Sequence, residues 1–257
     1  MTVHFIGAGP GAADLLTLRA VRLLGAADVC LYAGTYLDRA VLSHCRTDAE
    51  LVDTQYLDLD AIVDELVRAD ARGATVARLC SGDPSLYSAL TEQTRRLDER
   101  GIRWDVTPGV PAYAAAAALL GTELTVPEST QSVVLTRVAG TTRMPATEAL
   151  AGFARTRATL ALHLAIRRTR ELAAELTAEY GPDCPVVVVY RATRPEQLII
   201  RGSLADIADR VERAGLRQAA IILVGPVLAA TDCAESHLYD PARQRPGRPG
   251  PTEAGTR

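Results

Sequence analysis

Two glycine-rich loops, each placed after an apolar run, carry the residues that could hold a ligand. Residues 7–12 read Gly-Ala-Gly-Pro-Gly-Ala, and residues 81–85 read Ser-Gly-Asp-Pro-Ser. Glycine lets the backbone approach a ligand closely, and proline fixes the direction in which the chain leaves the loop. A third turn, Pro-Gly-Val-Pro at 108–111, follows another apolar run. Loops of this kind at strand ends favour the binding of a small ligand.

Asp83 is the acidic residue of the second loop, and it could complement a positively charged ligand. A carboxylate at this position could equally cap the following helix or lie in its first turn, where it would stabilise exposed backbone N–H groups. Both roles can hold at once.

The first loop also fits the glycine fingerprint of dinucleotide-binding folds if Ala12 replaces the third glycine. That fingerprint expects an acidic residue at the end of the second strand, but Asp28 lies before the expected strand 29–32. Pro10 also removes a backbone donor from the loop. A nicotinamide-dependent oxidoreductase is therefore a rival hypothesis, and a tight turn that only needs glycine is the alternative without a ligand.

The elements that must position these loops alternate in the first half of the chain. Short β-rich runs and amphipathic stretches follow one another, which is typical of a mostly parallel sheet covered by helices. We expect a helix capped by Asp14, and another that runs from Leu86 to about Gly101. The remaining expected elements are strands over 3–6, 29–32, 75–80 and 103–106 and helices over 62–73 and 112–120.

After a stretch without periodicity, the pattern starts again. We expect strands over 132–136, 159–163, 186–190, 197–201 and 219–224, a helix over 169–176, and another that Ser203 and Asp206 cap. The sequence thus predicts an α/β fold. Its predicted parts are an N-terminal lobe over 1–121, a linker over 122–131, a C-terminal lobe over 132–230, and a tail over 231–257 that is largely disordered at its end.

The composition limits the possible functions. No apolar run reaches the roughly 18 to 20 residues of a membrane span, and no leader is visible, so we expect a cytoplasmic protein without membrane contact. The five cysteines and four histidines are scattered, which argues against a metal site. A net charge of -3 gives no reason to expect nucleic acid. All 28 basic residues are arginine, whose guanidinium groups suit a substrate with several carboxylates.

In this order and spacing, the three loops resemble those of the tetrapyrrole methylase family. The resemblance covers about residues 2–228, and it includes the segments 15–18, 135–137, 190–193, 200–204 and 223–226. It implies two α/β lobes with the methyl donor S-adenosylmethionine, whose product is S-adenosylhomocysteine, in the cleft between them. It also implies a tetrapyrrole substrate and a homodimer.

Within this family, the chain most resembles the subgroup that converts precorrin-4 to precorrin-5 by methylation of carbon 11, on the way to cobalamin. The closer match rests on the segments 32–34, 53–54, 81–87, 131–137 and 144–145. The chain departs from the subgroup at 140–143 and at Thr35, where the subgroup has Gly-Arg-Thr-Pro and serine. Methylation of another ring carbon, or of the cobalt complex of the same substrate, is the alternative.

The resemblance assigns contacts with the donor to nine positions, which are Pro10, Ser81, Gly82, Asp83, Leu86, Pro111, Ala112, Leu164 and Ala192. For the substrate, we predict that Arg137 binds a carboxylate and that Tyr87 and Tyr113 flank the flat macrocycle. A surface arginine and ordinary helix packing are the alternatives for these three. The scattered cysteines and histidines imply no metal cofactor, and the sequence singles out no general base.

Methyl transfer from a sulfonium is an in-line displacement, so such an enzyme must chiefly align the two reactants and exclude water. It needs no nucleophilic side chain of its own, because the electron-rich ring attacks. A non-catalytic module that binds the donor or a tetrapyrrole is a rival from another functional class, and a turnover assay separates the two.

Overall fold

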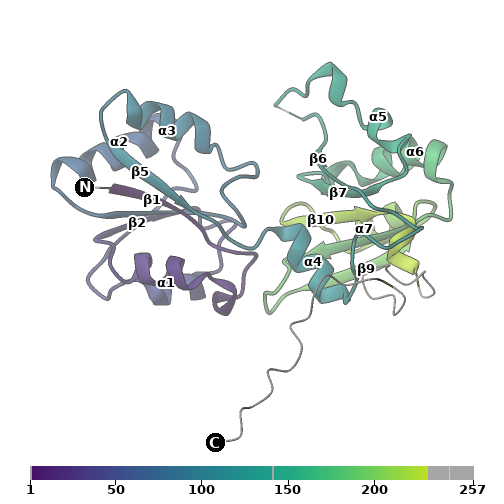
Figure 1. Cartoon of the computed structure of the whole chain (residues 1–257), viewed down its shortest axis with the longest axis horizontal. Helices are drawn as coiled ribbons and strands as arrows, with labels where there is room; N and C mark the ends of the chain where they lie inside the picture. Colours follow the sequence, from purple (N-terminus) through teal and green to yellow (C-terminus); the bar gives the residue numbers. More distant parts are fainter. Residues whose placement is uncertain (1, 141, 231–242, 244–257) are drawn as a thin grey trace, which may run out of the picture.

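The first lobe is built on a parallel sheet whose carboxyl-terminal edge carries the glycine loops. In the computed structural model, which describes residues 2–140, 142–230 and 243, the strand order is β3-β2-β4-β1-β5 and all neighbours are parallel (Figure 1). The strands are β1 (Thr2–Gly7), β2 (Val29–Tyr32), β3 (Glu50–Asp53), β4 (Val76–Cys80) and β5 (Arg103–Thr107).

Helices cover both faces of this sheet, which is why its central strands are apolar on both sides. One face packs against α1 (Leu18–Leu24) and the 3-10 helix Arg39–His44. The other face packs against α2 (Leu59–Ala71) and α3 (Leu90–Asp98). Ile6 and Leu66, for example, are fully buried on opposite faces.

The second lobe has a mixed sheet with the strand order β6-β7-β10-β8-β9. Only β6 and β7 are parallel, whereas the pairs β7–β10, β10–β8 and β8–β9 are antiparallel. The parallel strand arrangement of the first lobe is therefore not repeated in the second lobe. The link between β8 and β9 is short, and a short link can join only antiparallel strands. The strands are β6 (Val133–Arg137), β7 (Thr159–His163), β8 (Pro185–Tyr190), β9 (Leu198–Ser203) and β10 (Ala220–Val224).

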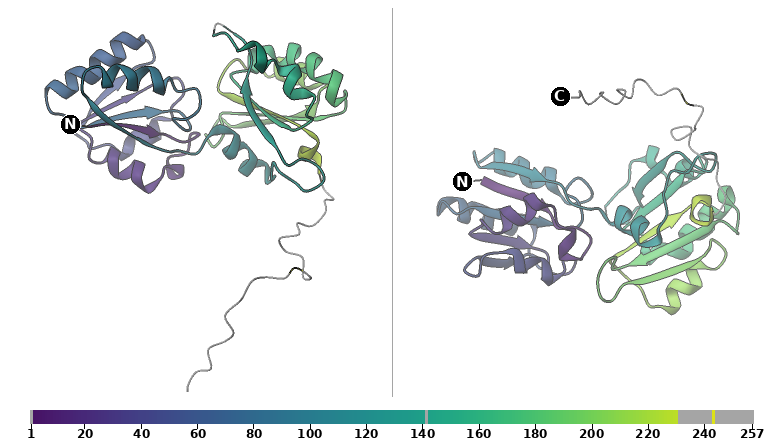
Figure 2. Two further views of the ribbon diagram at one scale, coloured as in Figure 1. Left: turned by 45° about the horizontal axis from the view of Figure 1, so that its top comes forward. Right: turned by 60° about the horizontal axis from the view of Figure 1, so that its bottom comes forward.

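One face of this sheet packs against α5 (Leu150–Ala154), α6 (Thr169–Tyr180) and α7 (Ile207–Arg213). The other face is covered by α4 (Ala112–Leu120), whose Ala116 is fully buried beside Val187 and Leu223. The sequence-based division assigned this helix to the N-terminal lobe, but the chain crosses to the second sheet just before it, at 108–111 (Figure 2). Apart from residue 243, the predicted tail lies outside the described residues.

Three local predictions need correction. The Thr17 side chain, not Asp14, caps α1 by accepting a hydrogen bond from the backbone N–H of Ala20 at 3.1 Å. The helix expected from Leu86 begins only at Leu90, since the left-handed Ala89, φ 53°, immediately precedes it. Ser203 does not cap α7, because this helix starts only after Asp206. The backbone N–H of Ser203 instead donates a hydrogen bond to the Asp206 carboxylate.

Other predicted strands and helices agree with the structure to within a few residues. The edge strand β3 and the short helix α5 were not predicted from the sequence. Within the described ranges, no helix is both long and apolar enough to cross a membrane.

Candidate functional site

The three loops meet at the carboxyl ends of β1, β4 and β5. Gly9 and Gly82 form an antiparallel bridge in which each backbone N–H donates to the other carbonyl, at 3.1 and 2.9 Å. The N–H of Gly109 donates to the Asp83 carboxylate at 2.8 Å. The loops therefore form one hydrogen-bonded unit, although about a hundred residues separate the first from the third.

Glycine is required where these backbones touch. A Cβ on Gly109 would lie 2.2 Å from the carbonyl oxygen of Gly82, and a Cβ on Gly7 would lie 2.4 Å from the nitrogen of Gly109. Gly82 itself has a φ of 67°, a conformation that other residues rarely adopt. The spacing of these three glycines thus reflects a close contact between three strand ends.

The Asp83 carboxylate holds the loops at 81–85 and 108–111 together. It accepts hydrogen bonds from the backbone N–H of Ser85 at 2.8 Å, from the Ser85 hydroxyl at 2.5 Å, and from Gly109. Burial raises the pKa of the carboxyl, but these hydrogen bonds together outweigh burial and hold the pKa below its usual range. Because α3 begins at Leu90, Asp83 caps no helix, and that alternative was wrong.

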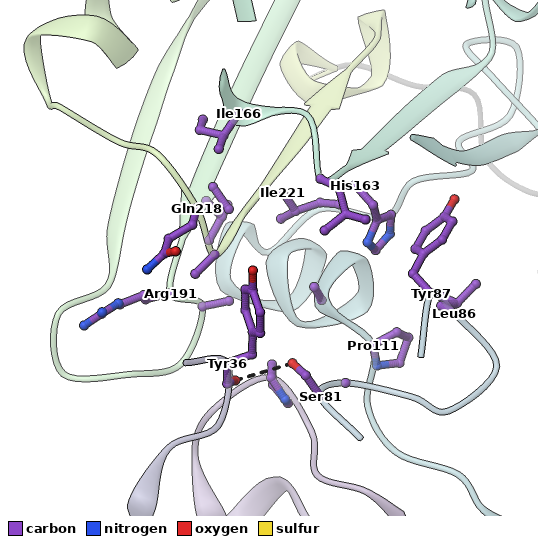
Figure 3. A pocket seen from close by; sticks show the side chains of 18 of the residues that line it. Tyr36, Ser81, Leu86, Tyr87, Pro111, His163, Ile166, Arg191, Gln218 and Ile221 are labelled. Carbon is purple, nitrogen blue, oxygen red and sulfur yellow. Dashed lines mark hydrogen bonds between the residues drawn. The ribbon is translucent and has the colours of Figure 1, made fainter. Parts of the chain in front are cut away.

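A cavity of about 510 Å³ opens between these loops and the second lobe (Figure 3). Each of the nine residues that the sequence assigned to the donor lines this cavity. Five of them come from the first lobe, Pro111 and Ala112 stand where the chain crosses to the second sheet, and Leu164 and Ala192 belong to the second lobe. Leu164 is 66% exposed, so it is accessible for contact with a ligand in the cavity.

The sequence missed most of the second-lobe lining, which comes from the ends of β7 and β8 and the start of β10. The missed residues are His163, Ile166, Arg167, Val189, Arg191, Arg194, Arg217, Gln218, Ala219, Ala220 and Ile221, together with Tyr36 of the first lobe. Segment 190–193 was recognised as a motif, but only Ala192 was assigned a role. The other positions have no distinctive spacing in the sequence.

Four of the missed residues form an arginine cluster, which consists of Arg167, Arg191, Arg194 and Arg217. The Nε atoms of Arg191 and Arg194 are buried without a hydrogen-bond partner within the described part of the chain. The Glu196 carboxylate lies 3.5 Å from the Arg191 guanidinium and forms an ion pair with it. Arg191 and Arg194 are half-buried and Arg167 and Arg217 are exposed, so the cluster presents incompletely paired guanidinium groups to the cavity, and these favour an anionic ligand.

The lobes also contact each other directly beside the cavity. The N–H of Ala12 donates to the Thr193 hydroxyl at 2.9 Å, and Arg194 donates to the carbonyl of Tyr36. A Cβ on Gly11 would lie 2.5 Å from the Arg194 side chain. These contacts place the second-lobe loop after β8 against the first glycine loop.

The three predicted substrate residues lie in different places. Tyr87 lines the large cavity and also a second one of about 300 Å³, which Arg137 and Met144 help to form. The Arg137 guanidinium donates to the carbonyls of Thr142 and Arg143, at 3.0 and 2.8 Å, and so holds the following loop. Tyr113 lines neither cavity and packs on the apolar core between α4 and the second sheet.

Comparison with known proteins identifies similar chains over nearly the whole length. The sequence pattern of the Tetrapyrrole (Corrin/Porphyrin) Methylases matches residues 2–208. A precorrin-4 C(11)-methyltransferase of Rhodococcus erythropolis is 52% identical over 246 residues, which cover 95% of this chain and 99% of the relative.

Two solved structures have similar folds. A cobalt precorrin-4 methyltransferase is 37% identical, with a TM-score of 0.85 over 88% of this chain and 95% of its own. The uroporphyrin-III C-methyltransferase of Thermus thermophilus, solved with S-adenosylhomocysteine, is 28% identical, with a TM-score of 0.74 over 89% and 93%. The expected fold class, two α/β lobes of this type, is confirmed.

Proposed function

The chain belongs to the tetrapyrrole methylase family, and we propose that it transfers a methyl group from S-adenosylmethionine to carbon 11 of precorrin-4, giving precorrin-5. The observation that carries this proposal is the 52% identity with a precorrin-4 C(11)-methyltransferase over 95% of the chain. The identity to the cobalt precorrin-4 enzyme is lower, at 37%, and this favours the metal-free substrate over its cobalt complex.

The cavity fits the methyl donor. Its volume of about 510 Å³ lies within the range of small-molecule sites, and its walls combine apolar side chains with a few polar and charged ones. We propose that the nine predicted residues, from Pro10 to Ala192, hold the donor there. When bound, S-adenosylmethionine supplies an electrophilic methyl group on a positively charged sulfur. The residues of the chain align that group, exclude water and bind the tetrapyrrole beside it.

The structure also weighs against the nicotinamide hypothesis. In dinucleotide-binding folds the glycine loop opens directly onto an α-helix, whereas here the short 3-10 helix Ala13–Leu15 follows the loop and α1 begins only at Leu18. Beside the end of β2, the Asp53 carboxylate accepts from the N–H groups of Gly34 and Gln55, both at 3.0 Å. It is therefore engaged by backbone rather than free to bind a ribose.

We expect the purified protein to convert precorrin-4 and S-adenosylmethionine into a product that is one methyl group heavier. Mass spectrometry measures the transfer, and NMR of the product locates the methyl group. Methylation at a different carbon would contradict the proposed position but not the family. Calorimetric titration with S-adenosylhomocysteine and with NAD is the second arm, and binding of NAD alone would contradict the methyltransferase.

We propose that the arginine cluster binds carboxylates of the tetrapyrrole. The substitution Arg191→Ala is then expected to raise KM for the tetrapyrrole about tenfold, because one charge-assisted hydrogen bond to the substrate is lost. Steady-state kinetics at several salt concentrations measures this, and the variant's KM should depend less on salt.

The matched control for this prediction is Arg95→Ala, which removes an exposed arginine from α3 that pairs with Glu99. Its kinetics should be unchanged. An Arg191→Ala enzyme with the wild-type KM but weaker binding of S-adenosylhomocysteine would assign the cluster to the donor instead.

The family resemblance also supports a homodimer, and we propose a cytoplasmic location together with the biosynthetic role that the similar precorrin-4 C(11)-methyltransferases suggest. Sedimentation of the purified protein tests the first of these, and cell fractionation tests the second. A monomer at the concentration of the activity assay would contradict the proposed dimer.

A further inference from the structure

His163 is the last residue of β7, and its imidazole lies in the wall of the large cavity. Its Nε2 atom is buried and has no hydrogen-bond partner within the described residues. Buried side-chain nitrogens nearly always have a partner, so an unpaired one in a residue of the cavity wall is a candidate for contact with the ligand. Figure 3 shows the ring beside that of Tyr87.

The imidazole stands where the two cavities adjoin. Its centroid lies 5.3 Å from that of Tyr87, the residue that lines both cavities. Tyr87 and Leu164 have φ values of 54° and 53°, so two neighbours of the ring are held in the left-handed region. Such strained residues persist only where the surroundings enforce them, and they concentrate at functional sites.

Burial lowers the pKa of His163, and no charged group contributes to that shift. Arg137 on β6 lies opposite His163 in the sheet. The other charged or titratable groups that line the two cavities are Tyr36, Asp83, Tyr87, Glu148, Arg167, Arg191, Arg194 and Arg217. Burial therefore favours the neutral imidazole, which carries a lone pair on one of its two ring nitrogens. A neutral imidazole can accept a proton.

The proposed methylation, on which this inference rests, also requires a proton acceptor. A carbon of the macrocycle forms a bond to the methyl group with a π electron pair, and the sulfur–methyl bond breaks with its electron pair left on sulfur. The macrocycle has then gained one positive charge, and the loss of a proton restores its original charge. We propose that Nε2 of His163 accepts this proton, which makes His163 a catalytic residue.

The test is His163→Gln, with His44→Gln in the first lobe as the matched control. We expect His163→Gln to lower kcat about 100-fold or more, because general base catalysis contributes factors of this size. KM for both substrates and the affinity for S-adenosylhomocysteine should stay within about threefold. The wild-type enzyme should lose kcat/KM at acid pH, below the ordinary histidine pKa of 6.5, and the variant should lack this acid limb.

The second measurement is NMR titration of His163 in the wild-type protein without substrate, assigned by comparison with the variant's spectrum. We expect its pKa to match that of the acid limb. A kcat within about threefold of wild type, a persisting acid limb, or pKa values that differ by about one unit or more would each overturn the role of His163. The kinetics use the tetrapyrrole that the wild type methylates, so failure of the wild type on precorrin-4 counts against the proposed substrate alone.

Discussion

Gly109→Ala is expected to lower the affinity for S-adenosylhomocysteine about 100-fold or more, as a result of a single added methyl group. That group would lie 2.2 Å from the carbonyl oxygen of Gly82 and 2.8 Å from the backbone of Gly7. Because all of these atoms are backbone, no side chain can rotate away. The three strand ends must move apart, and the hydrogen bond from Gly109 to Asp83 must lengthen or break.

The free energy of unfolding should fall as well, by about 3 kcal/mol, the upper end of what overpacking costs in a well-packed protein. Calorimetric titration measures the affinity, and urea unfolding measures the stability. The matched control is Gly152→Ala in α5, where an added Cβ meets nothing within 4 Å. Gly109→Ala with an affinity within about threefold of wild type would show that the glycine contact does not shape the donor site.

Much of the first lobe could be predicted from the sequence because its signals are local. Each glycine loop follows a short apolar strand, and parallel strands bring their carboxyl ends to one edge of the sheet. The bridge between Gly9 and Gly82 follows from that topology. The edge strand β3 was missed because only four residues form it, and they alternate little between apolar and polar.

The second-lobe wall could not be predicted in the same way. Its sheet is antiparallel around β10, so the residues that line the cavity come from the end of β7, the end of β8 and the start of β10. Nothing in the local sequence distinguishes His163 or Arg217 from other strand-end residues. Their function depends on which strands lie side by side, and a strand's neighbours are set by the packing of the whole lobe.

Tyr87 is a site residue whose local structure was predicted wrongly from the sequence. Helical spacing from Leu86 predicted that this side chain would lie on a helix, but the chain stays irregular until α3 begins at Leu90. The left-handed backbone at Tyr87 and Ala89 has no sequence signal, since neither residue favours that conformation. The strained loop nevertheless directs Tyr87 toward the junction of the two cavities.

Asp83→Asn is expected to lower the free energy of unfolding by about 3 kcal/mol at neutral pH, because hydrogen bonds to a charged group are stronger than those to a neutral amide. The carboxylate accepts from Ser85 and Gly109 together, whereas an amide offers one oxygen and a nitrogen that must donate. The loops at 81–85 and 108–111 would separate slightly, and the affinity for S-adenosylhomocysteine should fall about tenfold or more.

The pH dependence distinguishes this charge effect from a change of shape. Hydrogen bonds hold the Asp83 pKa below its ordinary value of 3.8, so its carboxylate contributes stability above that pH and loses the contribution as the pH falls through the folded-state pKa. The stability difference between wild type and Asp83→Asn should thus be largest at neutral pH and shrink in strong acid. Asp64→Asn, at an exposed position of α2, is the matched control. A difference that stays constant into strong acid would mean that the asparagine disturbs the loops by its shape alone.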